Sequence, residues 1–105
     1  MYKERGNLIA FIVIGRIMPY IKNESRGQYE NLLTELAAII PSDPMERPGH
    51  INYLVSKLLE KVYGKNMRYA HHNEVIGVLN CIMLEFYRRK TVPYEDEKIA
   101  SEGDI

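Results

Sequence analysis

The sequence predicts an all-α fold: a small helical bundle of three main helices and a short C-terminal helix. Three stretches repeat apolar residues at the spacing of one helix face, and prolines or glycines separate them. Apolar residues make up 46% of the 105 positions, which is enough for one core. We therefore expect a single domain over residues 1–105, with a helical core over 18–105.

The first main helix is predicted to follow Ser25, which forms an S-x-x-Q pattern with Gln28. In such a capping box the serine hydroxyl accepts a hydrogen bond from the glutamine amide, and the glutamine side chain reaches back. Pro41 ends this helix and opens a proline-rich loop over 41–49. The apolar face of the helix is expected to comprise Tyr29, Leu32, Leu33, Leu36 and Ile40.

The second main helix is predicted from His50 or Ile51 to Tyr63. Gly64 follows it and suits the position after a helix, where the backbone often takes a positive φ. The apolar face of this helix is expected to comprise Ile51, Leu54, Val55, Leu58, Leu59 and Val62.

The third and central helix is predicted over 73–89, capped by His72 or Asn73, with a start near Tyr69 as the alternative. It carries more apolar residues than one face holds, which is typical of a helix with partners on several sides. Gly77 and Cys81 lie on its second face, where they are expected to admit a close backbone approach. The first face is expected to comprise Val75, Val78, Leu79, Ile82, Met83 and Phe86.

A short, polar fourth helix is predicted after a break at 91–93, because Pro93 suits the first turn of a new helix. Acidic residues at 95–97 complement the positive N-terminal end of this helix, and Gly103 closes it. We expect it to fold back onto the central helix.

The N-terminal segment is apolar, and its structure is left open by the sequence. The run from Leu8 to Ile14 has no polar face, and it fits either a strand or a short buried helix. A glycine and an arginine end the run too early for a signal peptide, and it is too short to span a bilayer. An alternative is that Met18 is the true start and that residues 1–17 are translated leader sequence.

Charge and cysteine content exclude several classes of protein. The formal net charge is zero, which argues against general electrostatic binding of nucleic acid. Lys65, Arg68 and His71 form the remaining local candidate for such a role. Cys81 is the single cysteine, so the chain has no disulfide framework and no cysteine-based zinc site. A reduced, cytoplasmic location fits these features, and no membrane association is expected.

A polar cluster is predicted at the end of the central helix. Arg88 and Arg89 follow Glu85 at the i+3 and i+4 spacings that bring side chains together on a helix. Tyr94 and Asp96 come after the break and are expected to reach the same arginines. One interpretation is a structural network that fixes the angle between two helices. The other is an anion or phosphate site on the two guanidinium groups.

The histidines make a weak case for a metal site. His71 and His72 are adjacent, so their side chains diverge by about 100° on a helix. No H-E-x-x-H or C-x-x-C spacing is present. We expect surface or capping histidines, no metal, no cofactor and no catalytic residues.

Several motifs match a known pattern: Gly49-x-Ile51-Asn52-Tyr53, then Tyr69, then NEVIGVLNCIMLEFYRR, then PYEDEKIASEGDI. On these residues the chain resembles a family of small uncharacterised proteins encoded by bacteria and their phages. The resemblance covers about residues 18–105 and implies no substrate. The polar positions that match the family look like a connected framework: Asn52, Tyr53, Tyr69, Glu85, Tyr87, Arg88, Arg89, Tyr94, Glu95, Asp96, Lys98 and Asp104.

These observations favour a small non-enzymatic interaction protein of phage or prophage origin that forms a homo-oligomer, most simply a dimer. The reason is the apolar surface of the central helix and the N-terminal segment, which exceeds what two amphipathic neighbours cover. The alternative is a small binder or enzyme for an anionic ligand that uses Glu85, Arg88, Arg89 and Asp96.

Overall fold

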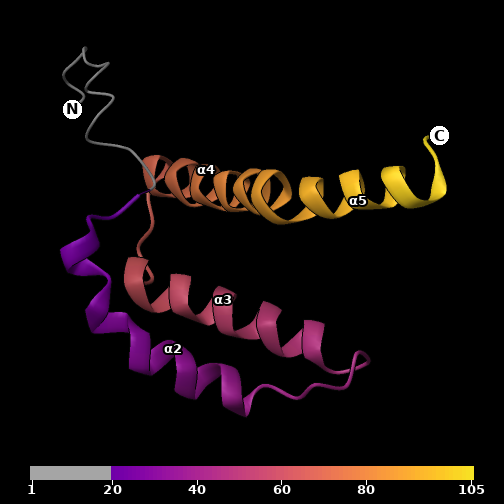
Figure 1. The fold of residues 1–105 in the computed structure, drawn as a ribbon. Helices are drawn as coiled ribbons and strands as arrows, with labels where there is room; N and C mark the ends of the chain where they lie inside the picture. Colours follow the sequence, from indigo (N-terminus) through magenta and orange to yellow (C-terminus); the bar gives the residue numbers. More distant parts are fainter. Residues whose placement is uncertain (1–19) are drawn as a thin grey trace. The chain divides into compact units, whose positions relative to one another are not determined.

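The structure, a computed structural model, describes residues 20–105 (Figure 1). The all-α prediction is confirmed for this part of the chain, which contains helices and turns and no strand. The predictions for the N-terminal segment and for a start at Met18 lie outside the described residues. The helical elements are η1 (Asn23–Ser25), α2 (Gly27–Ile39), α3 (Arg47–Tyr63), α4 (Tyr69–Phe86), η2 (Tyr87–Thr91) and α5 (Val92–Glu102).

The chain divides within α3 into two compact units, Met1–Lys57 and Leu58–Ile105. The described part of the first unit holds η1, α2 and most of α3. The second unit holds the end of α3, then α4, η2 and α5.

In the first unit, α2 forms as predicted but its capping box is only half present. Gln28 does reach back, but its Nε2 donates to the backbone carbonyl of Ser25, at 2.9 Å. The predicted bond to the Ser25 hydroxyl is absent, since no side chain caps α2. Ser25 is the last residue of the 3-10 turn η1, whereas an N-cap residue needs an extended backbone.

The loop before α3 is ordered by Asp43, and the helix begins at Arg47, three or four residues before the predicted start at His50 or Ile51. The side-chain carboxylate of Asp43 accepts a hydrogen bond from the Met45 amide at 2.9 Å. The backbone carbonyl of Asp43 accepts one from the Arg47 amide at 2.8 Å. Pro48 falls in the first turn of α3, where its missing N–H leaves no helix bond unmade. The predicted start was therefore too late, because a proline is tolerated in the first turn of a helix and does not mark a loop there.

An apolar groove of about 450 Å³ lies between the end of α2 and the start of α3. Its lining residues are Leu36, Ile39, Ile40, Gly49, His50, Tyr53 and Leu54.

In the second unit, a tight turn joins α3 to α4. Gly64 takes a φ of 81° after α3, as predicted. The helix that follows begins at Tyr69, so the alternative start is confirmed. His71 caps it, because its Nδ1 accepts a hydrogen bond from the Arg68 amide at 2.9 Å. The predicted caps, His72 and Asn73, lie inside the helix instead.

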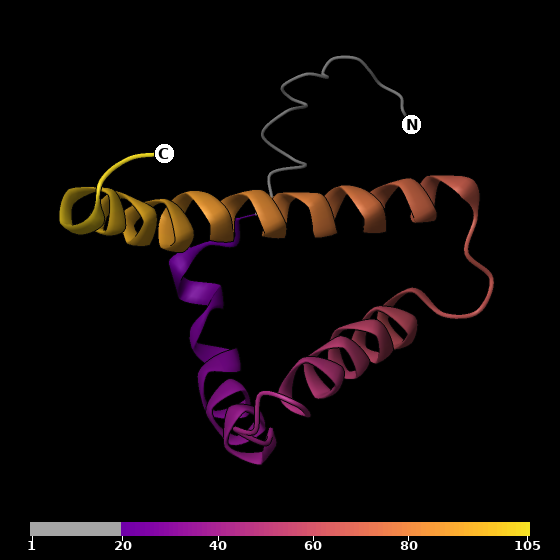
Figure 2. The ribbon, with the colours of Figure 1, turned by 90° about the vertical axis from the view of Figure 1, so that its right-hand side faces the viewer.

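The predicted break after α4 is wrong. A π-helical turn, η2, links α4 directly to α5, and Figures 1 and 2 show one continuous run of helix. Here the Val92 amide donates to the Tyr87 carbonyl, five residues back. In a regular α-helix the ring of Pro93 would collide with the carbonyl four residues before it. The wider π turn relieves that collision, so α5 continues α4 instead of folding back.

No residue between 20 and 105 is buried. On α4, Ile76, Ile82 and Phe86 are 58%, 56% and 62% exposed. A Cβ built on Gly77 would meet nothing within 4 Å, so the described residues of the second unit make no close approach at this glycine. The apolar faces predicted from the sequence are therefore present and uncovered in this part of the protein.

Candidate functional site

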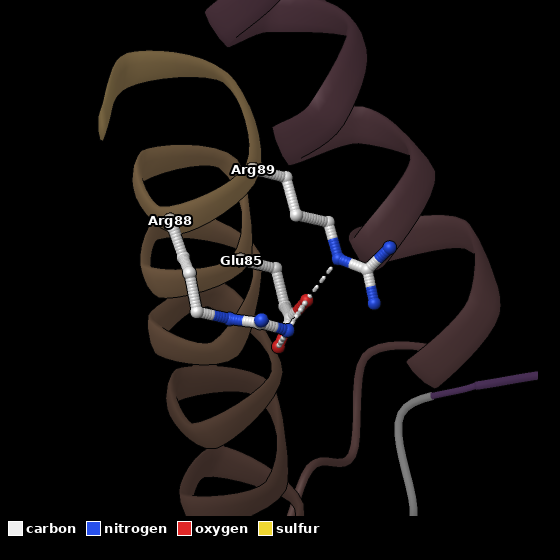
Figure 3. Close-up of polar contacts among 3 residues, drawn as sticks. All are labelled: Glu85, Arg88 and Arg89. Atoms are coloured by element: carbon white, nitrogen blue, oxygen red, sulfur yellow. Dashed lines mark hydrogen bonds and ion pairs between the residues drawn. The ribbon is translucent and has the colours of Figure 1, made fainter. Parts of the chain in front are cut away.

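The predicted polar cluster centres on Glu85. This residue is in the last turn of α4, and Arg88 and Arg89 are in η2. Figure 3 shows the Glu85 side chain between those of the two arginines. Arg89 Nε donates to Glu85 Oε1 at 2.7 Å. Arg88 Nη2 lies 3.2 Å from Glu85 Oε1 and 3.4 Å from Oε2. The i+3 and i+4 pairings that the sequence predicts are thus formed, with one carboxylate serving both guanidinium groups.

These ion pairs are largely open to solvent. The side chains of Arg88 and Arg89 are 65% and 58% exposed, and that of Glu85 is 32% exposed. Solvent screens such pairs, so each contributes only about 0.2–0.5 kcal/mol to the helix. The cluster keeps an excess of one positive charge and stabilises the end of α4 without fixing the angle of a second helix.

Tyr94 and Asp96 do not join this cluster. Lys98 Nζ lies 5.8 Å from the centre of the Tyr94 ring, and Asp96 makes no ion pair with any residue in 20–105. The reason is the continuous helix: Asp96 follows Arg89 by seven positions, about 10 Å along the axis at 1.5 Å per residue, instead of folding back beside it. Whether the predicted site residues bind a ligand stays a prediction.

A second polar contact spans the π turn. Tyr87 donates its hydroxyl hydrogen to Glu95 Oε1 at 2.9 Å. On a regular α-helix a residue eight positions on is rotated by about 80°, and the seventh is nearly in line. The π turn takes up one extra residue, so Glu95 occupies the aligned position. The contact therefore depends on the π turn and holds α4 and α5 together across it.

Next to this contact an open depression of about 440 Å³ lies along α5 and the C-terminus. Tyr87, Glu95, Lys98 and Ile99 form one side, and the end of the chain from Glu102 forms the other. Neither Arg88 nor Arg89 lines it. The depression and the arginines are thus separate features of this end of the helix.

A third contact, which the sequence did not predict, closes the turn between α3 and α4. Tyr63 donates to Glu74 Oε2, and the rings of Tyr63 and His71 lie 6.2 Å apart with a tilt of 60°, within the range of edge-to-face pairs. A turn of only five residues keeps the end of α3 close to the start of α4. The short turn was therefore the one feature of the sequence that could have indicated this contact.

Hydrogen bonds to carboxylates change the acidity of two tyrosines. The bond to Glu74, assisted by partial burial and by the carboxylate charge, raises the pKa of Tyr63 above its ordinary value of 10.0. The bond to Glu95 raises the pKa of Tyr87 in the same way, and the charge of the Glu95 carboxylate and partial burial add to the effect. Both bonds need the neutral phenol, so they stabilise the folded protein fully below pH 10. That stabilisation is lost as the pH rises through the raised pKa values.

We therefore expect two tyrosines to ionise late in an absorbance titration at 295 nm. Tyr63→Phe and Tyr87→Phe should each remove one late component, and Glu74→Gln should move the Tyr63 component to lower pH. Glu97→Gln makes the same charge change away from both phenols and is the control. A Tyr63 titration that is identical in the protein with and without Glu74→Gln would contradict the assignment.

Within 20–105, no three His, Cys, Asp or Glu side chains are grouped so that they could hold a metal ion. None of the helices in this range combines the length and apolar character needed to cross a bilayer.

Comparison with known proteins gives one result. A family model described as a domain of unknown function (DUF6899) matches residues 18–105. No curated protein and no solved structure matches the chain.

Proposed function

The chain belongs to the family described as a domain of unknown function (DUF6899), and we propose that it is a small, non-enzymatic interaction protein that assembles with copies of itself. The proposed setting is the cytoplasm, and the proposed origin is a phage or prophage, which follows from the resemblance of the C-terminal half to phage-encoded proteins.

The observation that carries this proposal is the apolar surface of α4. Val78, Ile82 and Phe86 occupy one face, and Ile76 and Leu84 lie outside it; all five are exposed. Burial of one such side chain contributes about 1.5–3 kcal/mol, and without it a chain of this size cannot offset the loss of conformational entropy on folding.

The other helices of the chain supply too little cover for α4. The apolar residues of α2 and α3 repeat mainly along one stripe each, at the spacing of a single face. Those two stripes also need partners, since Leu32, Leu33, Leu58 and Val62 are all more than half exposed. A helix that is apolar on two sides then retains one side for another molecule, and a second copy supplies a matching surface.

Light scattering coupled to size-exclusion chromatography tests the proposal. We expect the full chain at micromolar concentration to have at least twice the mass of one chain, which is 12.2 kDa. A chain that begins at Met18 should give the same number of copies if the interface lies in the helical part. A single-chain mass for both proteins would refute self-association.

The second candidate function is an anion or phosphate ligand binder, and one observation favours it. Arg88 and Arg89 stand more than half exposed on a π turn, and π turns inside helices are frequent at functional sites. Glu85 already pairs with both guanidinium groups, which weakens this candidate. Monomeric behaviour of the protein would make the arginine cluster the next site to test with inorganic phosphate.

A further inference from the structure

The two ends of the long helix in the second unit differ in charge. From 61 to 73, over the end of α3, the turn and the first residues of α4, there are three cations, Lys61, Lys65 and Arg68, and no carboxylate before Glu74. We call this the basic end. From 94 to 105 there is one cation, and the carboxylates are Glu95, Asp96, Glu97, Glu102 and Asp104. We call this the acidic end.

Many of these charges have no partner of opposite sign among the residues that the structure describes. Among residues 20–105, Lys61, Lys65 and Arg68 form no ion pair. The same holds for Asp96 and Glu97, whereas Glu102 pairs with Lys98 at 3.3 Å. The second unit thus presents unpaired positive charge beside the start of α4 and unpaired negative charge on α5, with exposed apolar side chains and the Glu85–Arg88–Arg89 cluster between them.

From this arrangement we propose that the run α4–η2–α5 pairs antiparallel with the same run of a second copy, about a two-fold axis near Ile82. This inference rests on the proposed self-association and specifies its geometry. The antiparallel direction places the basic end of each copy beside the acidic end of the other, twice per pair. A parallel pair would instead put like charges side by side, which opposes association.

The position of the axis follows from matching the two ends. Alignment of Arg68 with Glu97 of the second copy puts the axis between Ile82 and Met83. Around that axis Leu79 lies opposite Phe86, so the exposed apolar stripe of α4 pairs with itself. Charge and apolar pairing thus agree on one register.

Distances between spin labels test the direction of the pairing. In the full chain with Cys81→Ser, a label at Ser101→Cys lies on the acidic end, and a label at Asn66→Cys lies on the basic end. For an antiparallel pair, two copies labelled at 101 should be about 55 Å apart, given ~1.5 Å of rise per residue. Copies labelled at 66 mixed with copies labelled at 101 should give distances below about 25 Å, since paired helices lie roughly 10 Å apart.

The opposite pattern, short distances within one labelled species and long distances in the mixture, would overturn the antiparallel inference while leaving self-association intact. A single-chain mass in light scattering would overturn both. Each labelled protein must first show the mass of the unlabelled one, so that a labelling artefact is not taken for a result.

Charge reversal at the acidic end gives an independent readout in the same protein. Asp96→Lys with Glu97→Lys should weaken antiparallel association by about tenfold or more at low salt, because attraction becomes repulsion at both ends of the pair. Adding Lys65→Glu and Arg68→Glu to the same chain should restore it. Tighter association of the Asp96→Lys, Glu97→Lys protein would instead indicate parallel pairing and refute the proposal.

Discussion

Replacement of Ile82 by glutamate is expected to dissociate the protein into single chains at micromolar concentration. Ile82 is 56% exposed on the apolar face of α4, so the proposed interface would enclose its side chain. Burial of an unpaired carboxylate there costs several kcal/mol, and each ~1.4 kcal/mol is a factor of ten in affinity. The dissociation constant should therefore rise at least about 100-fold, as measured by sedimentation equilibrium.

Met45→Glu is the matched control for this substitution. Met45 is 88% exposed, but it lies in the loop before α3 and outside the helix faces. The same change of charge at this position should leave the mass unaltered. If Ile82→Glu and the parent protein sediment alike at every concentration, the α4 face is not an interface.

The second large effect is expected from Pro93→Ala, which should stabilise the protein. Proline inside a helix is about 3 kcal/mol less favourable than alanine, and the π turn η2 recovers only part of that difference. We expect the free energy of unfolding to rise by about 1–2 kcal/mol. Denaturant unfolding followed by circular dichroism, at one fixed protein concentration, measures this change.

The same variant should also change the acidity of Tyr87. Without the proline, the helix is free to become regular, and Glu95 would rotate by about 100° relative to Tyr87. Loss of the hydrogen bond would lower the pKa of Tyr87 toward its ordinary value. Pro48→Ala is the control, because Pro48 occupies the first turn of α3, where proline is tolerated. Unchanged stability and an unchanged Tyr87 titration in Pro93→Ala would show that the proline does not cause the π turn.

The helices themselves could be predicted because apolar residues repeat at helical spacing and glycines mark the ends. The φ of 81° at Gly64 follows from a rule that involves only neighbouring residues, whereas the cap on α4 was predicted at His72 or Asn73 and is made by His71. The pairing of Glu85 with Arg88 and Arg89 is equally local, since it depends on spacing along one helix.

The path of the chain after Phe86 could not be predicted in the same way. Pro93 is typical of a helix start, and only the backbone shows that a π turn lets the helix continue past this proline. That one feature moved Tyr94 and Asp96 out of reach of the arginines. Contacts such as that between Tyr63 and Glu74 depend on how two helices meet, which periodicity does not encode.

The π turn also bears on how sequences of this kind can differ in length. A π turn holds one residue more than the α-helical turn it replaces. Normally the deletion of one residue within a helix rotates everything downstream by about 100° and misdirects the faces beyond it. Here, a relative that lacks one residue between Tyr87 and Thr91, and that has another residue in place of Pro93, would form a regular helix. Its α5 would keep the present orientation. A single-residue gap in this segment of an alignment would therefore be a change of helix type that leaves the surface of α5 unchanged.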